Sequence, residues 1–443
     1  MLYRVHTHSS CLSPGVSMLA KHRAFDQPPT CTDQRTTATT MADVPSSFKV
    51  SIIVGDLSTK GAGRWGGAVR PFLLTKALQQ LGLQVEILGF SDDEAPLAVD
   101  SSVTVKRFPK TIYPTFVNSA MRLVRSIEGE LIYAYKTKAS SFGVGLLAKK
   151  IRRLPLALDI DDWEMSWHGG ETWRYHPSLK QRYRDCVQPN GAVRKPDHPI
   201  YLKRMEAQVH QADSVTVHTA FLQQKFGGAY IPNGKDTASF DPSLHDGPAN
   251  RRKYGLDDYK VLMFPGAPRP YKGLEDILTA LDILDRPDLR LVIVGGSPYD
   301  DYDKMLQQQW GRHIIQLPKL PYAEMPAVVS AADIIVVPQR DAAAAKAQFP
   351  LKLTDGMAMA KPILATAAGD IPTIIGNAGY LVAPGDSQAM ARQVAEILAN
   401  PADAQRRGDR ARDRCIQHYS IEAMAQALKG VVFPLIASHT SCE

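Results

Sequence analysis

The residues with the clearest chemistry lie in a turn between a predicted strand and a predicted helix. The apolar stretch VLMF at 261–264 predicts the strand, and LEDILTALDIL at 274–284 predicts the helix. Arg269 and Lys272 lie in the turn, and Gly273 opens the helix. The unpaired N–H groups at a helix start attract anions, and neighbouring cations strengthen that attraction. The turn therefore predicts a site for phosphate groups, the alternative being two solvated surface charges.

A second set of candidate residues is the acidic stretch LDIDDWE at 158–164. Asp159 and Asp161 alternate along a predicted strand, and Asp162 begins the loop after it. Ligands of open α/β sheets bind beyond the carboxyl ends of the strands, so we expect Asp161 and Asp162 to face a cleft as candidate catalytic residues. Two roles remain open for them: binding a second substrate, or capping a helix and pairing with a loop arginine.

A glycine-rich loop precedes the first predicted helix. GAGRWG at 61–66 matches the G-x-G-x-x-G dinucleotide fingerprint, but five residues separate it from the preceding strand. The fingerprint should follow the strand directly, so we expect no NAD site. Gly66 and Gly67 lie instead where missing side chains let backbone N–H groups approach a diphosphate or a second substrate. The alternative is a flexible loop that only turns the chain.

Two runs of alternating strands and helices position these residues. The first run covers residues 48–242 and the second covers residues 259–415. Alternation of this length predicts an α/β fold with a doubly wound parallel sheet in each run. The polar stretch 243–258 between them is expected to be a linker.

Two segments depart from this alternation. Residues 1–47 are rich in Ser, Thr and Pro and are expected to be a disordered extension, with Met41 as an alternative start to Met1. Residues 163–197 are aromatic, basic and interrupted by Pro and Gly. Long irregular segments inside a domain are usually functional loops or lids.

The composition restricts the classes of partner and compartment. The formal net charge of +7 favours phosphates, acidic lipids or nucleic acid as partners. The five cysteines are scattered without metal-site or disulfide spacing, which fits a reducing, cytoplasmic compartment. No apolar run is seen that approaches the roughly 20 residues of a membrane span, so any contact with an anionic membrane is expected to be peripheral.

Several segments taken in order resemble one enzyme family. MFPGAPRPYKG, LRLVIVGGSP, AADIIVVPQ, FPLKLTDGMAMAKPILAT and GYLVAPGD resemble the nucleotide-sugar half of the retaining glycosyltransferases of family 4. IPNGKDTASFDP at 231–242 resembles the end of the family's first domain. The resemblance covers about residues 48–420 and implies the GT-B architecture, in which two Rossmann-like domains face a cleft. It also implies that a helix within 416–443 crosses back onto the first domain.

The resemblance implies a function and roles for the candidate residues. The function is transfer of a sugar from a nucleotide-diphosphate donor to a hydroxyl acceptor with retention, without a metal or other cofactor and without nucleic acid. Lys272 matches the family's K-G pair and is expected to stabilise the leaving diphosphate together with Arg269. Gly66 and Gly67 match a glycine pair, and Gly266 stands in the nucleotide site where relatives place an arginine.

The sequence departs from the family at one important position. The family pattern has two glutamates seven residues apart, the first for the donor sugar and the second for the ribose. Alignment puts Asp355 at the second position and Ala347 at the first. We expect Gln348, Lys346 or Lys352 to take over the sugar contact, unless the sugar is held differently or the site has lost activity.

Other readings therefore remain open. The chain could be a glycosyltransferase-like binding subunit without catalysis, or a GT-B sugar-nucleotide epimerase. Asp159-Ile160-Asp161 matches the D-x-D motif that holds a metal in glycosyltransferases of another fold. His218 follows a strand and is expected to have a structural role. The donor base, the sugar and the acceptor are left undetermined by the sequence.

Overall fold

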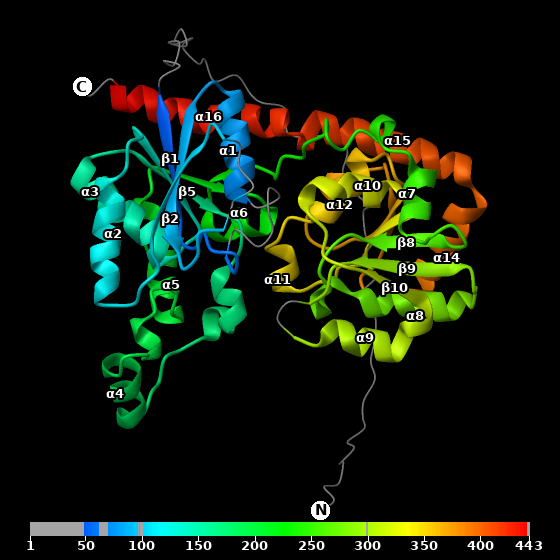
Figure 1. Ribbon diagram of the computed structural model, residues 1–443, viewed down its shortest axis with the longest axis horizontal. Helices are drawn as coiled ribbons and strands as arrows, with labels where there is room; N and C mark the ends of the chain where they lie inside the picture. Colours follow the sequence, from blue (N-terminus) through cyan, green and yellow to red (C-terminus); the bar gives the residue numbers. More distant parts are fainter. Residues whose placement is uncertain (1–47, 62–69, 96, 98–100, 298–299, 441–443) are drawn as a thin grey trace, which may run out of the picture. The chain divides into compact units, whose positions relative to one another are not determined.

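Two parallel sheets form the frame of the protein in the computed structural model (Figure 1). The structure describes residues 48–61, 70–95, 97, 101–297 and 300–440. The extension expected at 1–47 and the predicted site residues Gly66 and Gly67 lie outside the described residues.

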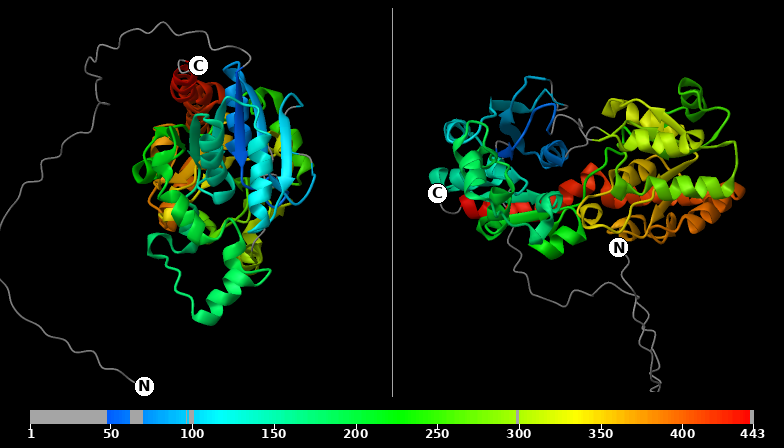
Figure 2. Two further views of the ribbon diagram at one scale, coloured as in Figure 1. Left: turned by 90° about the vertical axis from the view of Figure 1, so that its left-hand side faces the viewer. Right: turned by 90° about the horizontal axis from the view of Figure 1, so that it is seen from below.

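The first sheet has seven strands in the order β3-β2-β1-β4-β5-β6-β7, and every neighbouring pair is parallel. Its strands are apolar through most of their length because helices cover both faces of a doubly wound sheet (Figure 2). The strands are β1 (Lys49–Val54), β2 (Gln84–Ser91), β3 (Thr104–Pro109), β4 (Leu131–Tyr135), β5 (Leu156–Ile160), β6 (Ser214–Val217) and β7 (Ala229–Tyr230). The connecting helices include α1 (Arg70–Gln80), α2 (Thr115–Arg125), α3 (Val144–Arg152), α4 (Leu179–Val187), α5 (Pro199–Glu206) and α6 (Ala220–Phe226).

The second sheet has six parallel strands in the order β10-β9-β8-β11-β12-β13. The two sheets confirm the prediction of two doubly wound parallel units. The strands are β8 (Lys260–Phe264), β9 (Leu289–Val294), β10 (Ile314–Leu317), β11 (Ile334–Val337), β12 (Ile363–Thr366) and β13 (Tyr380–Val382). Its helices include α8 (Leu274–Leu284), α9 (Tyr302–Trp310), α10 (Met325–Ser330), α11 (Ala343–Lys346), α12 (Leu351–Ala358), α13 (Ile371–Ile375) and α14 (Ser387–Ala399).

The segment expected to be a plain linker contains a helix. Helix α7 (Gly247–Lys253) lies within 243–258 and packs against α10. Asn250 donates to Ser330 Oγ at 2.9 Å, and Arg251 pairs with Asp333 at 3.0 Å. Helix α7 therefore packs as part of the second α/β unit and is not a free linker between the two α/β units.

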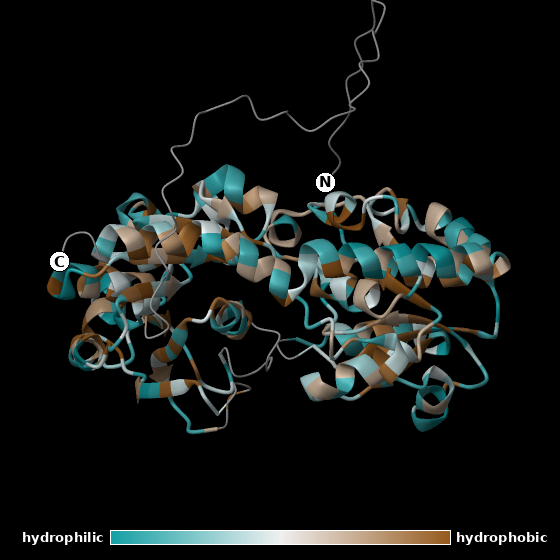
Figure 3. Cartoon of the chain, turned by 90° about the horizontal axis from the view of Figure 1, so that it is seen from above, coloured by the Kyte–Doolittle hydropathy of each residue, from teal (hydrophilic) through white to brown (hydrophobic). Residues whose placement is uncertain are grey.

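Two long helices close the chain. Helix α15 (Pro401–Tyr419) packs against α12, and α16 (Ile421–Thr440) packs against α1 of the first sheet. In Figure 3, α15 is mostly hydrophilic, whereas α16 mixes hydrophobic and hydrophilic residues. The chain thus crosses back to the first α/β unit at Ser420, as the family resemblance implied.

Helix α16 corrects one expectation of the sequence analysis. Over Ile421–His439 it has the length and the mean hydropathy, 1.3, of a helix that could span a membrane. Met424, Leu428 and Val432 are nevertheless buried in the hydrophobic core beside β1. Length and composition alone are weak grounds for a span, and the structure buries 33% of this window in the protein.

Candidate functional site

A cavity of about 960 Å³ is lined by residues of both α/β units. Each sheet reverses its strand order at one point, between β1 and β4 in the first and between β8 and β11 in the second. Asp56 follows β1, Lys136 follows β4, Pro265 follows β8 and Gln339 follows β11, and all four line the cavity. Ligands of doubly wound sheets bind at such switch points, so the topology places a binding site here.

The structure brings together every predicted site residue that it describes. Residues from segments far apart in the sequence meet in this one cavity, as the sequence analysis expected. They are Asp161, Asp162, Gly266, Arg269, Lys272, Lys352 and Asp355.

The turn before α8 depends on a glycine. Residues Pro270–Lys272 form one short helical turn, and Gly273 follows with φ +70°. A Cβ at Gly273 would collide with the carbonyl oxygen of Pro338. Only glycine therefore allows the start of α8 to lie against the end of β11, and this contact fixes Lys272 at the cavity wall.

Lys272 and Lys352 place positive charge in the cavity, near Asp162 and Asp355 respectively but without a direct ion pair among the described residues. Lys272 Nζ donates to Gln348 Oε1 at 3.2 Å, and neither lysine forms an ion pair within the described residues. Burial, followed by repulsion from Lys352, lowers the pKa of Lys272 well below its usual value. Burial also lowers the pKa of Lys352. Two partly buried ammonium groups in this state form a site for an anion.

Arg269 and Gly266 complete this wall of the cavity. Arg269 Nη1 pairs with Asp300 at 2.8 Å, so part of its charge is already balanced. A Cβ at Gly266 would lie 2.6 Å from Lys352 Cε. Gly266 therefore leaves the space that the Lys352 side chain occupies, and its contact with the nucleotide stays a prediction.

The acidic residues lie on the opposite wall, at the end of β5. Asp161 accepts a hydrogen bond from Tyr135 and lies 3.3 Å from Lys136 Nζ. Asp162 Oδ2 accepts from Trp167 Nε1 at 3.1 Å, whereas Asp162 Oδ1 is buried without a hydrogen-bond partner among the described residues. The second oxygen of Asp162 therefore has unused hydrogen-bonding capacity beside the cavity.

Asp162 lies beside a neighbouring ion-pair cluster. Lys136 contacts Glu164 at 2.7 Å and Lys138 contacts it at 3.3 Å. Burial would raise the pKa of Glu164, but the two lysines lower it to about 2. Burial raises the pKa of Asp162 to about 6 despite the attraction of Lys136. Glu164 therefore forms ion pairs with the two lysines, whereas the Asp162 carboxylate has less stabilisation of its charge.

The raised pKa of Asp162 predicts a pH-dependent effect on stability. A carboxyl whose pKa rises on folding penalises the folded state, and the penalty is absent at low pH and complete above about pH 6. Asp162→Asn should therefore raise the melting temperature of the unliganded protein by a few degrees at pH 8. The difference should shrink toward pH 4, and calorimetry at both pH values measures it.

Asp161→Asn is the matched control for this prediction. Asp161 already has Tyr135 and Lys136 as partners, so its replacement should lower the melting temperature at pH 8. Equal destabilisation by Asp161→Asn and Asp162→Asn would show that Asp162 is an ordinary structural carboxylate.

Asp159 does not form a metal site with Asp161, because an arginine occupies it. Arg70 Nη2 lies 2.9 Å from Asp159 Oδ1, and Arg70 Nε lies 3.0 Å from Asp159 Oδ2. Arg70 also donates to the carbonyl of Ile231 at 2.7 Å and to Asn233 Oδ1 at 2.9 Å. Sequence reasoning missed Arg70, because an arginine at a helix start gives no local sign of a buried partner 89 residues away.

Asp355 lines the cavity and has a second partner inside the protein. It accepts from the ammonium of Lys235, which is 3% exposed. Lys235 lies in the segment that leaves the first α/β unit, and its backbone bonds to Tyr419 and Ile421 at the crossing of α15 and α16. The sequence predicted Asp355 for the ribose but gave no sign of this ion pair.

At the position where the family has its sugar-binding glutamate, this chain has a buried alanine, Ala347. Ala347 is fully buried, and its carbonyl oxygen lies 3.2 Å from His218 Nε2. Gln348 lines the cavity instead, and its Oε1 also accepts from Tyr271 at 3.1 Å. Burial lowers the pKa of His218 to about 4, so a neutral imidazole links the two units, which agrees with the structural role expected for it.

Comparisons with known proteins identify a family for the second α/β unit. Residues 246–414 match the family model "Glycosyl transferases group 1". The chain is 29% identical over 211 residues to a GDP-mannose-dependent alpha-(1-6)-phosphatidylinositol monomannoside mannosyltransferase of Mycolicibacterium smegmatis. That match covers 44% of this chain and 55% of the relative, so the chain spans about half the length of that protein. An MMP alpha-(1->4)-mannosyltransferase of Mycolicibacterium hassiacum is 25% identical, covering 74% of this chain and 76% of the relative.

A solved structure shares the fold. Sucrose-phosphate synthase from Thermosynechococcus elongatus superposes with a TM-score of 0.64 at 19% identity, covering 88% of this chain and 100% of that one. This likeness confirms the GT-B arrangement of two parallel α/β units expected from the sequence.

Proposed function

The chain belongs to the group 1 glycosyl transferases, and we propose that it transfers a sugar from a nucleotide-diphosphate donor to a hydroxyl acceptor with retention of configuration. The observation that carries the proposal is the pair Lys272 and Lys352. Both ammonium groups line the cavity, and burial lowers both pKa values although Asp162 attracts Lys272 and Asp355 attracts Lys352. Neither lysine forms an ion pair among the described residues. A diphosphate supplies the charge that they lack.

The donor nucleotide lies on the second α/β unit in this proposal. Lys272 and Arg269 contact the diphosphate, and their charge stabilises it as the bond to the sugar breaks. Asp355 accepts from the ribose hydroxyls with the lone pairs that Lys235 leaves unused. No metal ion and no other cofactor is needed, because fixed cations supply the charge that a metal would otherwise provide.

The sugar and the acceptor lie between the two walls of the cavity. Gln348 takes the sugar contact, because Ala347 points into the protein and Gln348 lines the cavity. The carboxyl of Asp162 accepts from the acceptor hydroxyl and orients it. The acceptor oxygen bonds to the anomeric carbon on the face that the phosphate leaves, and the departing phosphate oxygen takes the hydroxyl proton. Atoms and charge balance without a protein nucleophile.

The names of the relatives suggest which substrates to test first. The relatives from Mycolicibacterium smegmatis and Corynebacterium glutamicum are named as GDP-mannose-dependent and act on phosphatidylinositol monomannosides. GDP-mannose with a lipid-linked acceptor is therefore the first combination to test, with a cytoplasmic enzyme in peripheral contact with the membrane.

A ligand panel tests the proposal directly. Thermal shifts with UDP, GDP, ADP and their sugars should single out one base, which at 100 times its dissociation constant adds about 2.7 kcal/mol of stability. The shift and the turnover of the labelled donor should both persist in EDTA.

The outcomes of the panel separate the alternatives. Binding without turnover on any acceptor would identify a binding subunit, and conversion of the free donor without an acceptor would identify an epimerase. Activity that EDTA abolishes and manganese restores would contradict the metal-independent mechanism.

A further inference from the structure

Helix α4 (Leu179–Val187) contributes no side chain to the hydrophobic cores of the described residues. It lies in the irregular segment 163–197 and extends away from the first sheet (Figure 1). All of its side chains except Asp185 are exposed. Ser178 caps its start by accepting from the backbone N–H of Gln181 at 3.2 Å, so the helix is locally well formed. It has the hydrogen bonds of a helix, but none of its apolar side chains is buried against the described residues of the protein.

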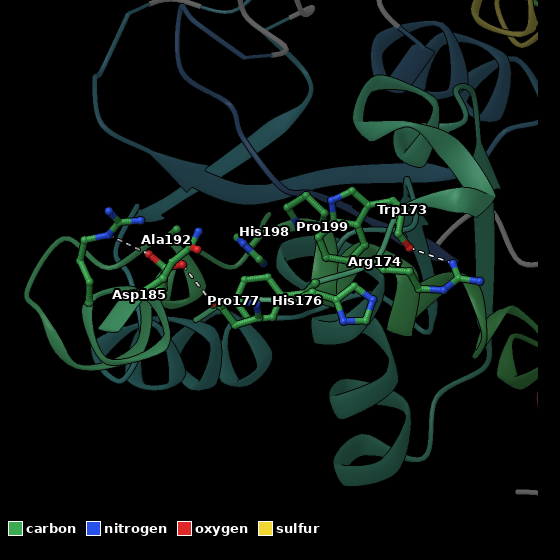
Figure 4. A pocket seen from close by; sticks show the side chains of 11 residues that line it. Trp173, Arg174, His176, Pro177, Asp185, Ala192, His198 and Pro199 are labelled. Carbon is green, nitrogen blue, oxygen red and sulfur yellow. Dashed lines mark hydrogen bonds and ion pairs between the residues drawn. The ribbon is translucent and has the colours of Figure 1, made fainter. Parts of the chain in front are cut away.

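The polar face of α4 is the one that faces the protein. Gln181, Arg184 and Asp185 line a cavity of about 450 Å³, in which Figure 4 shows Asp185 and His198. Asp185 accepts from the Tyr175 hydroxyl at 3.0 Å and from Arg184 Nε at 3.2 Å. Because Tyr175 lies outside the helix, its bond to Asp185 turns the Asp185 side of α4 toward the protein, whereas the Arg184 contact lies within the helix.

The apolar face of α4 points to solvent. Leu179, Tyr183 and Val187 are 87%, 61% and 57% exposed. They are four residues apart, so they form one stripe along the helix. A surface helix of a soluble protein normally turns such a stripe toward the core. In α4 the stripe is exposed among the described residues, so it is open to an apolar partner.

Basic side chains border the stripe on both sides. At 100° per residue, Lys180 lies on one side of the stripe and Arg182 on the other. Residues 174–187 contain four basic side chains and a single acidic one, the buried Asp185. The face that reaches solvent thus combines apolar residues at its centre with positive charge at its edges, as in helices that lie at a lipid interface.

We propose that α4 docks onto an anionic phospholipid bilayer. Leu179, Tyr183 and Val187 enter the interfacial region, and Lys180 and Arg182 contact lipid phosphates. A nine-residue helix is only about 13 Å long, which is too little surface for the roughly 800 Å² per partner of a stable protein interface. A second copy of the chain would also bring like charges together. The inference is independent of the proposed transferase activity.

Vesicle flotation of the full chain tests the proposal. The protein should float with vesicles of phosphatidylcholine containing 30% phosphatidylglycerol (about 30 mol% is enough to charge the surface) and much less with phosphatidylcholine alone. Lys180→Gln with Arg182→Gln should weaken partitioning on the order of 20-fold, at about fivefold per basic residue. Serine at Leu179, Tyr183 and Val187 together should reduce it at least about tenfold.

Matched controls separate α4 from a general surface effect. Serine at three exposed apolar residues elsewhere, Leu244, Ile283 and Ile416, should leave flotation unchanged. Circular dichroism and melting temperature should be the same for the α4 variants as for the unmodified chain, because the replaced side chains are exposed. Failure of the unmodified protein to float, or undiminished flotation of the α4 variants, would overturn the proposal. So would α4 variants that lose only self-association in analytical ultracentrifugation.

Discussion

Lys272→Met should reduce turnover on the order of 10²–10³-fold, comparable with the loss of one donor to a developing oxyanion. The Lys272 ammonium lies at the cavity wall with Gln348 as its hydrogen-bond acceptor, and burial and Lys352 lower its pKa. Its contact with the diphosphate strengthens as the leaving group gains charge, so the rate should fall more than nucleotide affinity. Steady-state kinetics and nucleotide titrations measure the two effects separately.

The stability of the same variant distinguishes a binding role from a structural one. A lysine whose pKa is lowered on folding penalises the folded state at neutral pH, so Lys272→Met should melt at the same temperature or higher without ligand. Lys272→Arg should keep only part of the activity, because a planar guanidinium group replaces a compact ammonium group. Lys260→Met, at an exposed position in β8, should be fully active. Near-normal turnover of Lys272→Met would refute the assignment of the diphosphate to this turn.

Asp355→Ala should lower the free energy of unfolding by about 3–5 kcal/mol, because it leaves the buried ammonium of Lys235 without a partner. Burial would lower the pKa of Lys235, and the charge of Asp355 more than offsets that effect and raises it. The same variant should weaken nucleotide binding by about 1.5–3 kcal/mol through the lost ribose contact. Urea unfolding and nucleotide titration measure the two quantities.

A double variant isolates the ion pair. Lys235→Met with Asp355→Leu removes both charges and should recover most of the lost stability without recovering nucleotide affinity. Asp300→Ala is the control, since it breaks a more exposed pair with Arg269 that should contribute no more than about 1 kcal/mol. If Asp355→Ala kept full unliganded stability, Asp355 would serve only the ligand, as expected from the sequence.

The sequence by itself determined the features that depend on neighbouring residues. The strand, the Gly/Pro turn with Arg269 and Lys272, and the helix after Gly273 are set by local preferences. Alternation of strands and helices over 48–242 and 259–415 was enough to predict two doubly wound sheets. Those sheets in turn placed the ends of their strands at a common edge, so the sequence also predicted that Asp161 and Asp162 would reach the cavity.

Only the tertiary structure decided which charged residues have partners inside the protein. Arg70 with Asp159 and Lys235 with Asp355 join residues 89 and 120 positions apart, and neither pairing leaves a trace in the local pattern. Ala347 and Gln348 are adjacent, yet backbone direction alone buries one and exposes the other to the cavity.

The sequence likewise could not predict which side of α4 faces the protein. The sequence was interpreted as an irregular loop or lid over 163–197, and helix α4 within it was missed. An apolar stripe on a surface helix is normally buried. The contact of Asp185 with Tyr175, in the irregular stretch before the helix, holds the Asp185 side toward the protein, and the stripe faces outward instead. A sequence specifies which side chains share a face, but the direction in which that face points depends on contacts with distant or irregular parts of the chain.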